Sequence, residues 1–460
     1  MSSLPVVILM TSNGVGMGHL SRQLTISLSG PQQFQPVLFS LSGALPRIAA
    51  ADRDGELPGS LDRAIRYEYA PSRESGWLPR RGWRRALRRR YRSYRWHPYL
   101  RDRLVSLAAE TGASAVIFDG VVPYDGLLRA RTLLPDLGFI WMRRGMWRPT
   151  APSGQLAASE RFDAVLQPGD FGGAADRGPL SERTDAEHIA PVSLTDVLPV
   201  TTREEARSRL GLPVDGPVLL LAPGSGALGS IEASAALVQQ AVRESGPEWT
   251  IAVTKQAISR HNVSTASDRV VALDDVYPLS RHMAAFDAAV SAAGYNSVHE
   301  LLGAGVPTLF VPSVNHVTDD QGARAHGVAA RGAAMVATSD DDVRHGIASL
   351  LTESRREELR GVCAVLEAPG GGREAARRIA DLASVSAPTT LPVVRPRPSR
   401  PVVDARTRTG GDTGISLRFA DEIAVKDVRA RHPVEHLLPG SSTDYHLARE
   451  RTAAWLYEER

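Results

Sequence analysis

The stretch LPVVILMTSNGVGMGHLSR, residues 4–22, joins a short apolar run to a glycine-rich turn and the start of a helical pattern. Its first seven residues include β-branched side chains and show no polar–apolar alternation, which is typical of a buried parallel strand. Apolar residues recur with helical spacing from Leu20 onward, and PVLFSLSG (residues 36–43) predicts a second strand. This order of strand, glycine turn, helix and strand predicts a doubly wound α/β sheet.

The alternation of strands and helices occurs in two series along the chain. The first series continues with strands expected at residues 114–120 and 137–142. A helix in TTREEARSRLGL (residues 201–212), with a threonine cap and a capping-box glutamate, opens the second series. Further strands are expected at residues 217–226, 249–254, 269–273, 286–294 and 307–313. The chain is therefore expected to form two Rossmann-like doubly wound domains that face a central cleft, where ligands bind beyond the carboxyl ends of the strands.

We expect the first domain over residues 1–195 and the second over 196–386, followed by a Pro/Arg-rich linker (387–401) and a C-terminal extension of unknown role (402–460). No run approaches the roughly 18 consecutive apolar residues that span a bilayer, and no basic segment precedes the first apolar run. A single cysteine, Cys363, excludes internal disulfide bonds and cysteine-rich metal sites and is expected to be a small buried residue. These features predict a cytoplasmic protein.

The opening glycines do not form a dinucleotide fingerprint. After Gly14 and Gly16, the third glycine of G-x-G-x-x-G would stand at position 19, where the chain has a histidine. The second strand also ends without the acidic residue that binds ribose, and no Gly-Lys-Ser/Thr follows. The turn still offers backbone N–H groups at a helix start, which suits an anion or a close-packed ligand; a tight turn without a ligand is the alternative.

His19 is expected to project from the first helical turn into the cleft, where a histidine can act as a general base near neutral pH. Asp119, at the carboxyl end of a later strand of the same domain, is the candidate to orient the imidazole. The alternatives are a capping or packing role for His19 and a turn-capping role for Asp119. Trp141, Arg143, Arg144 and Trp147 follow another strand, where they could line the same side of the cleft or form a packed loop.

The basic charge of the chain is concentrated in one segment. The whole chain carries +3, whereas residues 80–103 carry eleven arginines against one acid, Asp102, so that the rest of the chain is net acidic. Trp83, Leu87, Tyr91 and Tyr94 share one helical face, and Pro98 is expected to limit or kink the helix. A cationic amphipathic helix suits an anionic membrane surface or acceptor. A nucleic-acid groove and a solvated face of codon-biased composition are the less favoured alternatives.

The segment SAAGYNSVHELLGAGVPTLFVPSVNHVTDDQGARA (residues 291–325) combines elements that suit a nucleotide sugar. Gly294 lets the backbone approach a diphosphate, and Glu300, about one turn into a helix, can accept both ribose hydroxyls. Asp320 and Gln321 can bind hexose hydroxyls, while PGSGALG (residues 223–229) supplies further N–H donors to phosphate.

This segment resembles the C-terminal donor domain of the MurG-like glycosyltransferases, which have the GT-B fold and a C-terminal domain of glycosyltransferase family 28 type. Shared features are the strand-end glycine, the helical glutamate, an Ala-Gly-x-Pro turn, an apolar strand and a Gln-Gln or Asp-Gln pair. GVGMGHLSR (residues 14–22) resembles the glycine-rich acceptor loop of that group. The resemblance in architecture covers about residues 4–385, but only three segments match in motif.

The resemblance implies an acceptor-binding first domain and a UDP-sugar-binding second domain. It implies that Glu300 binds ribose, that Asp320 and Gln321 bind the sugar, and that the backbone near Val276 binds uracil. For the diphosphate it implies Ser225 and Gly226, and for the acceptor side the residues Gly14, Gly16, Gly18 and Arg22. His19 would be the base or a stabilising group close to it. The chain has Ala292–Ala293–Gly294 where the family has Arg-Ser-Gly or similar, and Asp320 where it has a glutamine. A side-chain phosphate contact is therefore lost, and the hexose is left open.

The expected reaction is inverting transfer of a GlcNAc- or glucose-type hexose from a UDP-sugar to a hydroxyl of a lipid-linked or other hydrophobic or anionic acceptor. Helix N-termini would stabilise the departing UDP, so that no metal and no cofactor besides the co-substrate are expected. The alternatives are a UDP-sugar 2-epimerase of the same fold and a non-catalytic GT-B partner protein. The basic segment would place the protein peripherally on the inner face of the membrane.

Overall fold

The computed structural model describes residues 4–12, 17–59, 65–72, 84–224, 231–255, 269–274, 276–314, 316–367, 369–386 and 389, with side chains left out at 84–95, 231–232 and 255. Residues 1–389 form one compact unit. Apart from residue 389, the predicted linker and C-terminal extension lie outside the described residues. Within the described helices, none is long and apolar enough to cross a bilayer.

The first domain contains a seven-stranded sheet in the order β3-β2-β1-β4-β5-β6-β7, with every neighbouring pair parallel. Its strands are β1 (Val6–Thr11), β2 (Gln35–Ser40), β3 (Arg66–Tyr69), β4 (Ala113–Asp119), β5 (Gly138–Met142), β6 (Ala164–Pro168) and β7 (Glu187–Ile189). Its helices are α1 (Gly18–Ser29), α2 (Leu45–Arg53), α3 (Arg84–Thr111) and α4 (Asp125–Leu133). The sequence reading missed β3, β6 and β7, which are short or lie near the sheet edges and carry little apolar pattern of their own.

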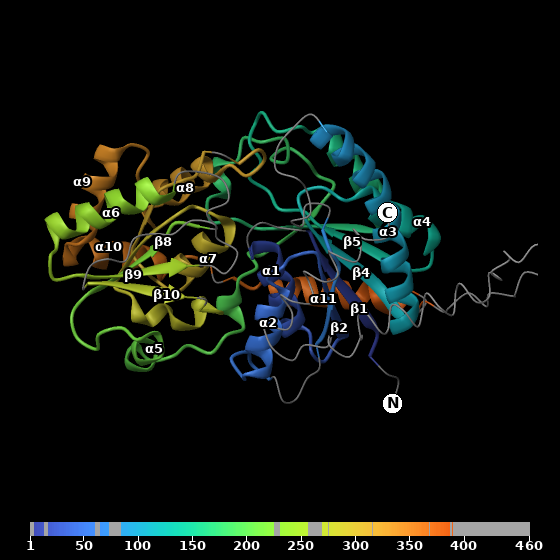
Figure 1. Cartoon of the computed structure of the whole chain (residues 1–460), viewed down its shortest axis with the longest axis horizontal. Coiled ribbons are helices and arrows are strands. Elements are labelled where there is room, and N and C mark those ends of the chain that lie inside the picture. The colour runs from blue at the N-terminus through green and yellow to red at the C-terminus, as the bar shows by residue number, and fades with distance from the viewer. Residues whose placement is uncertain are drawn as a thin grey trace, which may run out of the picture. The chain divides into compact units, whose positions relative to one another are not determined.

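The second domain contains a six-stranded parallel sheet in the order β10-β9-β8-β11-β12-β13 (Figure 1). Its strands are β8 (Val218–Ala222), β9 (Thr250–Lys255), β10 (Val270–Asp274), β11 (Ala288–Ser291), β12 (Thr308–Phe310) and β13 (Met335–Val336). Its helices are α5 (Arg203–Leu210), α6 (Ile231–Ser245), α7 (Tyr295–Gly303), α8 (Gln321–Ala330), α9 (Asp340–Leu350) and α10 (Glu353–Cys363). The two parallel sheets confirm the predicted fold class.

Local sequence signals explain several helix ends. The side chain of Thr202 accepts a hydrogen bond from the Glu205 backbone, and Glu205 bonds back to the Thr202 backbone, which completes the capping box before α5. Cys363 is buried at the end of α10, as expected. Helix α3 continues through Pro98, so this proline does not end the helix; Trp96 is buried and its indole N–H donates to the Pro71 carbonyl at 2.9 Å.

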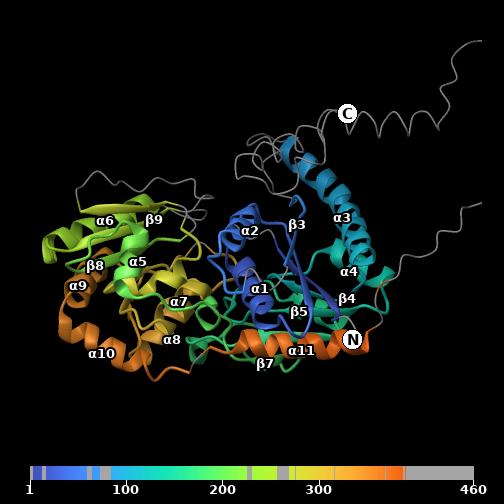
Figure 2. The same cartoon turned by 90° about the horizontal axis from the view of Figure 1, so that it is seen from below.

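The last helix, α11 (Gly371–Val385), leaves the second domain and packs on the first (Figure 2). Its buried face consists mainly of small residues that join the core beneath α1; these are Ala375, Ala376, Ile379 and Ala383. At Gly372 a Cβ would lie 2.7 Å from Ser29 Oγ, so the absence of a side chain permits this close helix crossing. The C-terminal part of the predicted second domain therefore belongs to the first core.

Candidate active site

His19 and Asp119 lie together at the carboxyl edge of the first sheet. Thr11, the last residue of β1, pairs with Asp119, the last residue of β4, and α1 begins shortly after β1. This register brings the first turn of α1 over the end of β4. His19 Nδ1 lies 2.6 Å from Asp119 Oδ1, with the His19 side chain 16% exposed and Asp119 1% exposed. The structure thus brings together the two residues that the sequence reading paired.

Hydrogen bonding selects the tautomer of His19. Asp119 is held as a carboxylate, because the charge of Arg22 and the contact with His19 keep the pKa of Asp119 below its usual value although burial opposes this. A carboxylate only accepts, so the 2.6 Å contact assigns the proton to Nδ1 and leaves the lone pair on Nε2. Arg22 Nη2 also lies 2.8 Å from Nδ1, but it directs its N–H to Asp119 Oδ1 at 2.7 Å. Burial lowers the pKa of His19 despite the opposing influence of Asp119, which favours the neutral ring. A neutral imidazole held in this way can take up a proton at Nε2.

Arg22 takes a different position from the one implied on the acceptor side. Its side chain is only 1% exposed, and its guanidinium donates to both oxygens of Asp119, from Nε at 2.9 Å and from Nη2 at 2.7 Å. The backbone of Gly18 lies near the second domain, since a Cβ at this position would be 3.7 Å from Asn296 Oδ1. Gly14 and Gly16 lie outside the described residues.

The predicted donor residues of the second domain follow the carboxyl ends of β8, β10, β11 and β12. Gly294 is the N-cap of α7, and no side chain caps this helix start. A Cβ at Gly294 would lie 4.0 Å from Gln321 Nε2, so these two predicted residues are neighbours. Val276 follows β10 and packs against the core of the second domain. Ser225 and Gly226, which follow β8, lie outside the described residues.

Glu300 is the single acidic residue of α7, and its pKa is shifted. Burial raises its pKa to about 7. Within the described part of the chain, no hydrogen bond reaches its carboxylate. A partly buried acid without a protein donor can accept hydrogen bonds from the hydroxyl groups of a ligand.

Asp320 and Gln321 both have protein partners in the ligand-free chain. The side chain of Asp320 accepts a hydrogen bond from the Ala323 backbone at 2.9 Å and caps α8. Gln321 is buried, its Oε1 accepts from the Ser313 backbone at 3.0 Å, and its Nε2 lies 3.0 Å from His316 Nε2. Because the glutamine nitrogen only donates, His316 Nε2 is the acceptor in this pair.

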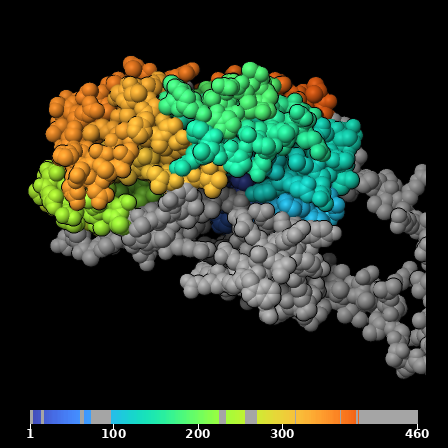
Figure 3. Space-filling model, turned by 90° about the horizontal axis from the view of Figure 1, so that it is seen from above, coloured from blue at the N-terminus to red at the C-terminus, as the bar shows by residue number. Residues whose placement is uncertain are grey.

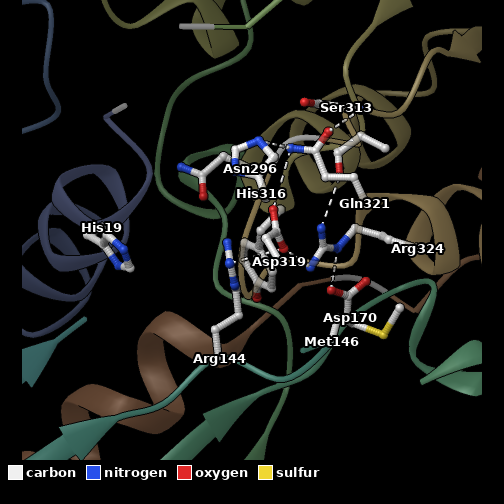
Figure 4. A network of polar contacts seen from close by, with 12 residues as sticks. His19, Arg144, Met146, Asp170, Asn296, Ser313, His316, Asp319, Gln321 and Arg324 are labelled. Carbon is white, nitrogen blue, oxygen red and sulfur yellow. Dashed lines mark hydrogen bonds and ion pairs between the residues drawn. The ribbon is translucent and has the colours of Figure 1, made fainter. Parts of the chain in front are cut away.

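Sequence reasoning missed Asp319, which lies at the centre of a buried ion-pair network (Figure 4). Its carboxylate is 3.0 Å from Arg144 Nη2, contributed by the loop after β5, and 3.0 Å from Arg324 Nη2 in α8. Arg324 also donates from Nε to Asp170 at 2.7 Å, and Asp170 follows β6 in the first domain. No local pattern of the sequence marks Asp319, because its partner Arg144 belongs to the other domain.

Backbone contacts join the two domains at the same place. The Arg148 N–H donates to the Thr318 carbonyl at 2.8 Å, and the Asp320 N–H donates to the Met146 carbonyl at 2.9 Å. In Figure 3 residues of the first domain, coloured teal to green, meet residues of the second domain, coloured orange, on the face seen from above. Trp141, in β5, and Arg143 and Trp147, in the loop that follows, are all buried, and Arg143 pairs with Asp185 at 2.7 Å, so the loop is packed. Arg144, by contrast, reaches the second domain.

The described residues therefore combine a histidine oriented by a carboxylate in one domain with two features of the other. These are a start of α7 without a side-chain cap and the acid Glu300, for which the described part of the chain provides no hydrogen-bond donor. Arg22 reaches Asn296 Oδ1 at 3.5 Å and so connects the two sets. This arrangement can remove a proton from a hydroxyl group and can hold a ligand that has both an anionic part and free hydroxyls.

Comparison with known proteins supports a relation to glycosyltransferases. Residues 232–372 match the glycosyltransferase family 28 C-terminal domain. The chain is 31% identical over 213 residues to a protein of Clavibacter sepedonicus named UDP-N-acetylglucosamine--N-acetylmuramyl-(pentapeptide) pyrophosphoryl-undecaprenol N-acetylglucosamine transferase, with 44% of this chain and 52% of the relative covered. A protein of the same name from Rhodococcus jostii (strain RHA1) is 29% identical, with 50% and 60% covered. The chain thus spans between half and two thirds of the length of these relatives.

Solved structures support the same fold. The structure of MurG from Acinetobacter baumannii covers 82% of this chain and matches over 100% of its own length, with a TM-score of 0.51 and 16% identity. The structure of Os79 from O. sativa in complex with U2F and trichothecene covers 82% of this chain and matches over its whole length, with a TM-score of 0.57 and 14% identity. At these identities the likeness concerns the fold alone. The chain therefore has the two-domain GT-B fold, and its residues 232–372 match the glycosyltransferase family 28 C-terminal domain.

Proposed function

We propose that the protein transfers a GlcNAc- or glucose-type hexose from a UDP-sugar to a hydroxyl of a lipid-linked or other hydrophobic or anionic acceptor. The observation that carries this proposal is the 2.6 Å contact of His19 with Asp119, in the same chain as a family 28 C-terminal domain. The relatives named above transfer N-acetylglucosamine to a pyrophosphoryl-undecaprenol compound according to their names. This supports the choice of donor and acceptor class.

In the proposed reaction His19 acts as the general base. The acceptor oxygen attacks the anomeric carbon while its proton passes to His19 Nε2, and the bond from the anomeric carbon to the UDP oxygen breaks with its electron pair going to UDP. Attack on the face opposite UDP inverts the configuration. Asp119 stabilises the imidazolium that forms, because it is ionised and accepts the Nδ1–H bond at 2.6 Å.

Departure of UDP leaves negative charge on the diphosphate. The N-terminus of α7 offers unpaired N–H groups after Gly294, and the first turn of the helix contains no acidic residue. A helix start of this kind stabilises an anion without a metal ion. The proposed reaction is accordingly metal-independent.

Binding of the donor provides the first test, because it should depend on the protonation of Glu300. Since burial raises the pKa of Glu300 to about 7, the carboxylate is ionised above that pH and protonated below it. Only the ionised form accepts both ribose hydroxyls with all its lone pairs. Calorimetric titration with UDP-GlcNAc and UDP-glucose should therefore show weaker binding as the pH falls through about 7.

Glu300→Gln should remove this pH dependence, and Glu300→Ala should weaken binding by about tenfold or more, since hydrogen bonds to a charged group contribute ~1.5–3 kcal/mol. Glu244→Gln, which changes a carboxylate on the surface of α6, serves as the matched control and should bind like the wild type. Product detection by mass spectrometry, with the same UDP-sugars and a membrane-lipid extract, then tests transfer. The absence of detectable UDP-sugar binding at any pH would refute the proposal.

We further propose that the basic segment of residues 80–103 binds an anionic membrane surface and so brings the enzyme to its acceptor. Its net charge of +10 supports this, at about 1 kcal/mol for each basic residue near such a surface. The aromatic face predicted at Trp83, Leu87, Tyr91 and Tyr94 lies outside the residues whose side chains are described.

Flotation with liposomes of phosphatidylglycerol and phosphatidylcholine should recover the protein with the anionic vesicles and release it at high salt. Replacing Arg88, Arg89 and Arg90 with glutamine should reduce the bound fraction without changing UDP-sugar binding. Equal partitioning to pure phosphatidylcholine would contradict an electrostatic role for the segment.

A further inference from the structure

Arg22 occupies the inner side of the histidine–carboxylate pair. It lies one helical turn after His19 in α1, and its side chain is 1% exposed. The guanidinium donates to Asp119 Oδ2 from Nε at 2.9 Å and to Oδ1 from Nη2 at 2.7 Å, which fixes the plane of the carboxylate. Its Nη2 also lies 2.8 Å from His19 Nδ1. Arg22 thus contacts the carboxylate that orients His19.

The opposite side of the Arg22 guanidinium faces the second domain. Its central carbon lies 5.0 Å from the centre of the Tyr295 ring, in the first turn of α7, and Nη1 lies 3.5 Å from Asn296 Oδ1. Tyr295 is itself held in place, because its hydroxyl donates to the Gly169 carbonyl at 2.9 Å and accepts from the Val192 N–H at 3.1 Å. Arg22 thus touches the start of the helix at which we place the donor diphosphate.

We infer that Arg22 is a positioning residue that couples the orientation and charge of the His19–Asp119 pair to the start of α7 in the second domain. This inference rests on the proposed function, because it gives the pair a catalytic purpose. Separation of the domains would remove the ring and the amide from one side of the guanidinium. The base would then be fully oriented only when the donor domain is in place.

The charges around the His19–Asp119 pair predict how the pKa of His19 responds to a change at Arg22. His19 is faced by Asp119 from β4, by Arg22 from its own helix and by Arg144 from the loop after β5. Arg22 is faced by Asp119, Tyr295 and Asp319. Loss of the Arg22 charge removes a positive neighbour that opposes protonation of His19, so the pKa of His19 should rise.

Titration of the His19 imidazole by ¹⁵N NMR in the ligand-free protein tests this inference. Arg22→Gln should raise the pKa of His19 by about one unit. The acidic limb of the kcat/KM profile should shift to higher pH by the same amount. Arg22→Lys keeps the charge but loses the two parallel hydrogen bonds to Asp119, so the pKa of His19 should change less than in Arg22→Gln. Its kcat should fall by about ten- to hundredfold, with little change in the KM of the UDP-sugar.

Arg207→Lys is the matched control. Arg207 is also fully buried and donates to an aspartate, Asp287, at 2.9 Å, but it lies in the second domain away from His19. The Arg207→Lys substitution should lower the melting temperature of the protein and leave the pKa of His19 unchanged. An unchanged His19 pKa in folded Arg22→Gln would overturn the inference. If Arg22→Gln does not fold, an Arg22→Lys variant with wild-type kcat would overturn it. Because the titration needs no substrate, it remains decisive even if no UDP-sugar is turned over.

Discussion

His19→Ala should lower kcat for glycosyl transfer by about 10²–10⁴-fold, the usual contribution of a positioned general base. Donor binding should change little, because the residues that we propose for the donor lie in the second domain. The wild-type rate should fall at acidic pH as His19 becomes protonated. Burial lowers the pKa of His19, so this fall should occur at lower pH than for an ordinary histidine. Initial rates measured across the pH range, with the acceptor saturating, check both expectations.

Asp119→Asn should also reduce kcat. The amide of asparagine can donate to His19 Nδ1 and so favour the tautomer that carries its proton on Nε2, which cannot act as the base. A matched control is His345→Ala, since His345 is exposed on α9 in the second domain. A His19→Ala enzyme with wild-type kcat would show that the base lies elsewhere. In that case the 2.6 Å contact between His19 and Asp119 would be structural.

Asp319→Ala should destabilise the protein by about 3–5 kcal/mol, the range observed when one partner of a buried ion pair is removed. Asp319 is 6% exposed and lies 3.0 Å from both Arg144 and Arg324. Its charge, together with Asp170, compensates these two guanidinium groups. Urea unfolding should show the loss as a lower midpoint, because removal of Asp319 leaves buried positive charge unpaired.

Asp319→Asn should lower the free energy of unfolding nearly as much as Asp319→Ala, since it keeps the volume of the side chain and removes only its charge. Glu358→Ala breaks an exposed pair with Arg355 on α10 and should change the free energy of unfolding by only about 0–1 kcal/mol. An Asp319→Ala variant as stable as Glu358→Ala would mean that water or a rearranged side chain compensates the two arginines.

The first half of the site could be predicted because it depends on sheet geometry. Neighbouring parallel strands end at the same edge, so an acid at the end of β4 and a histidine just after β1 must lie near each other. The positions of Glu300 and Gln321 follow from a similar rule, since each follows a strand end of the second sheet at a short distance along the chain, whereas their donor-binding roles stay predictions. What each of these residues could do chemically followed from its type and spacing.

The partners of Arg22, Arg144 and Asp319 could not be predicted in the same way. Each makes a contact between segments more than a hundred residues apart, and such contacts depend on how the two domains approach each other. Arg22 matched an acceptor-side motif by position, yet its guanidinium is directed at Asp119 and Tyr295. The packing of α11 on the core of the first domain could not be predicted either, because its face of small residues would suit either domain.

Apolar periodicity and turn residues thus sufficed to predict two doubly wound domains and the pair of His19 and Asp119, because these features arise from local backbone preferences and strand order. The charge state of that pair depends on its burial and on Arg22 and Arg144, which the fold of the first domain brings beside it. Burial and ion pairing act over a few ångströms in space, whatever the separation along the chain, so the tertiary fold was needed to assign Arg22 to the base and Asp319 to the contact between domains.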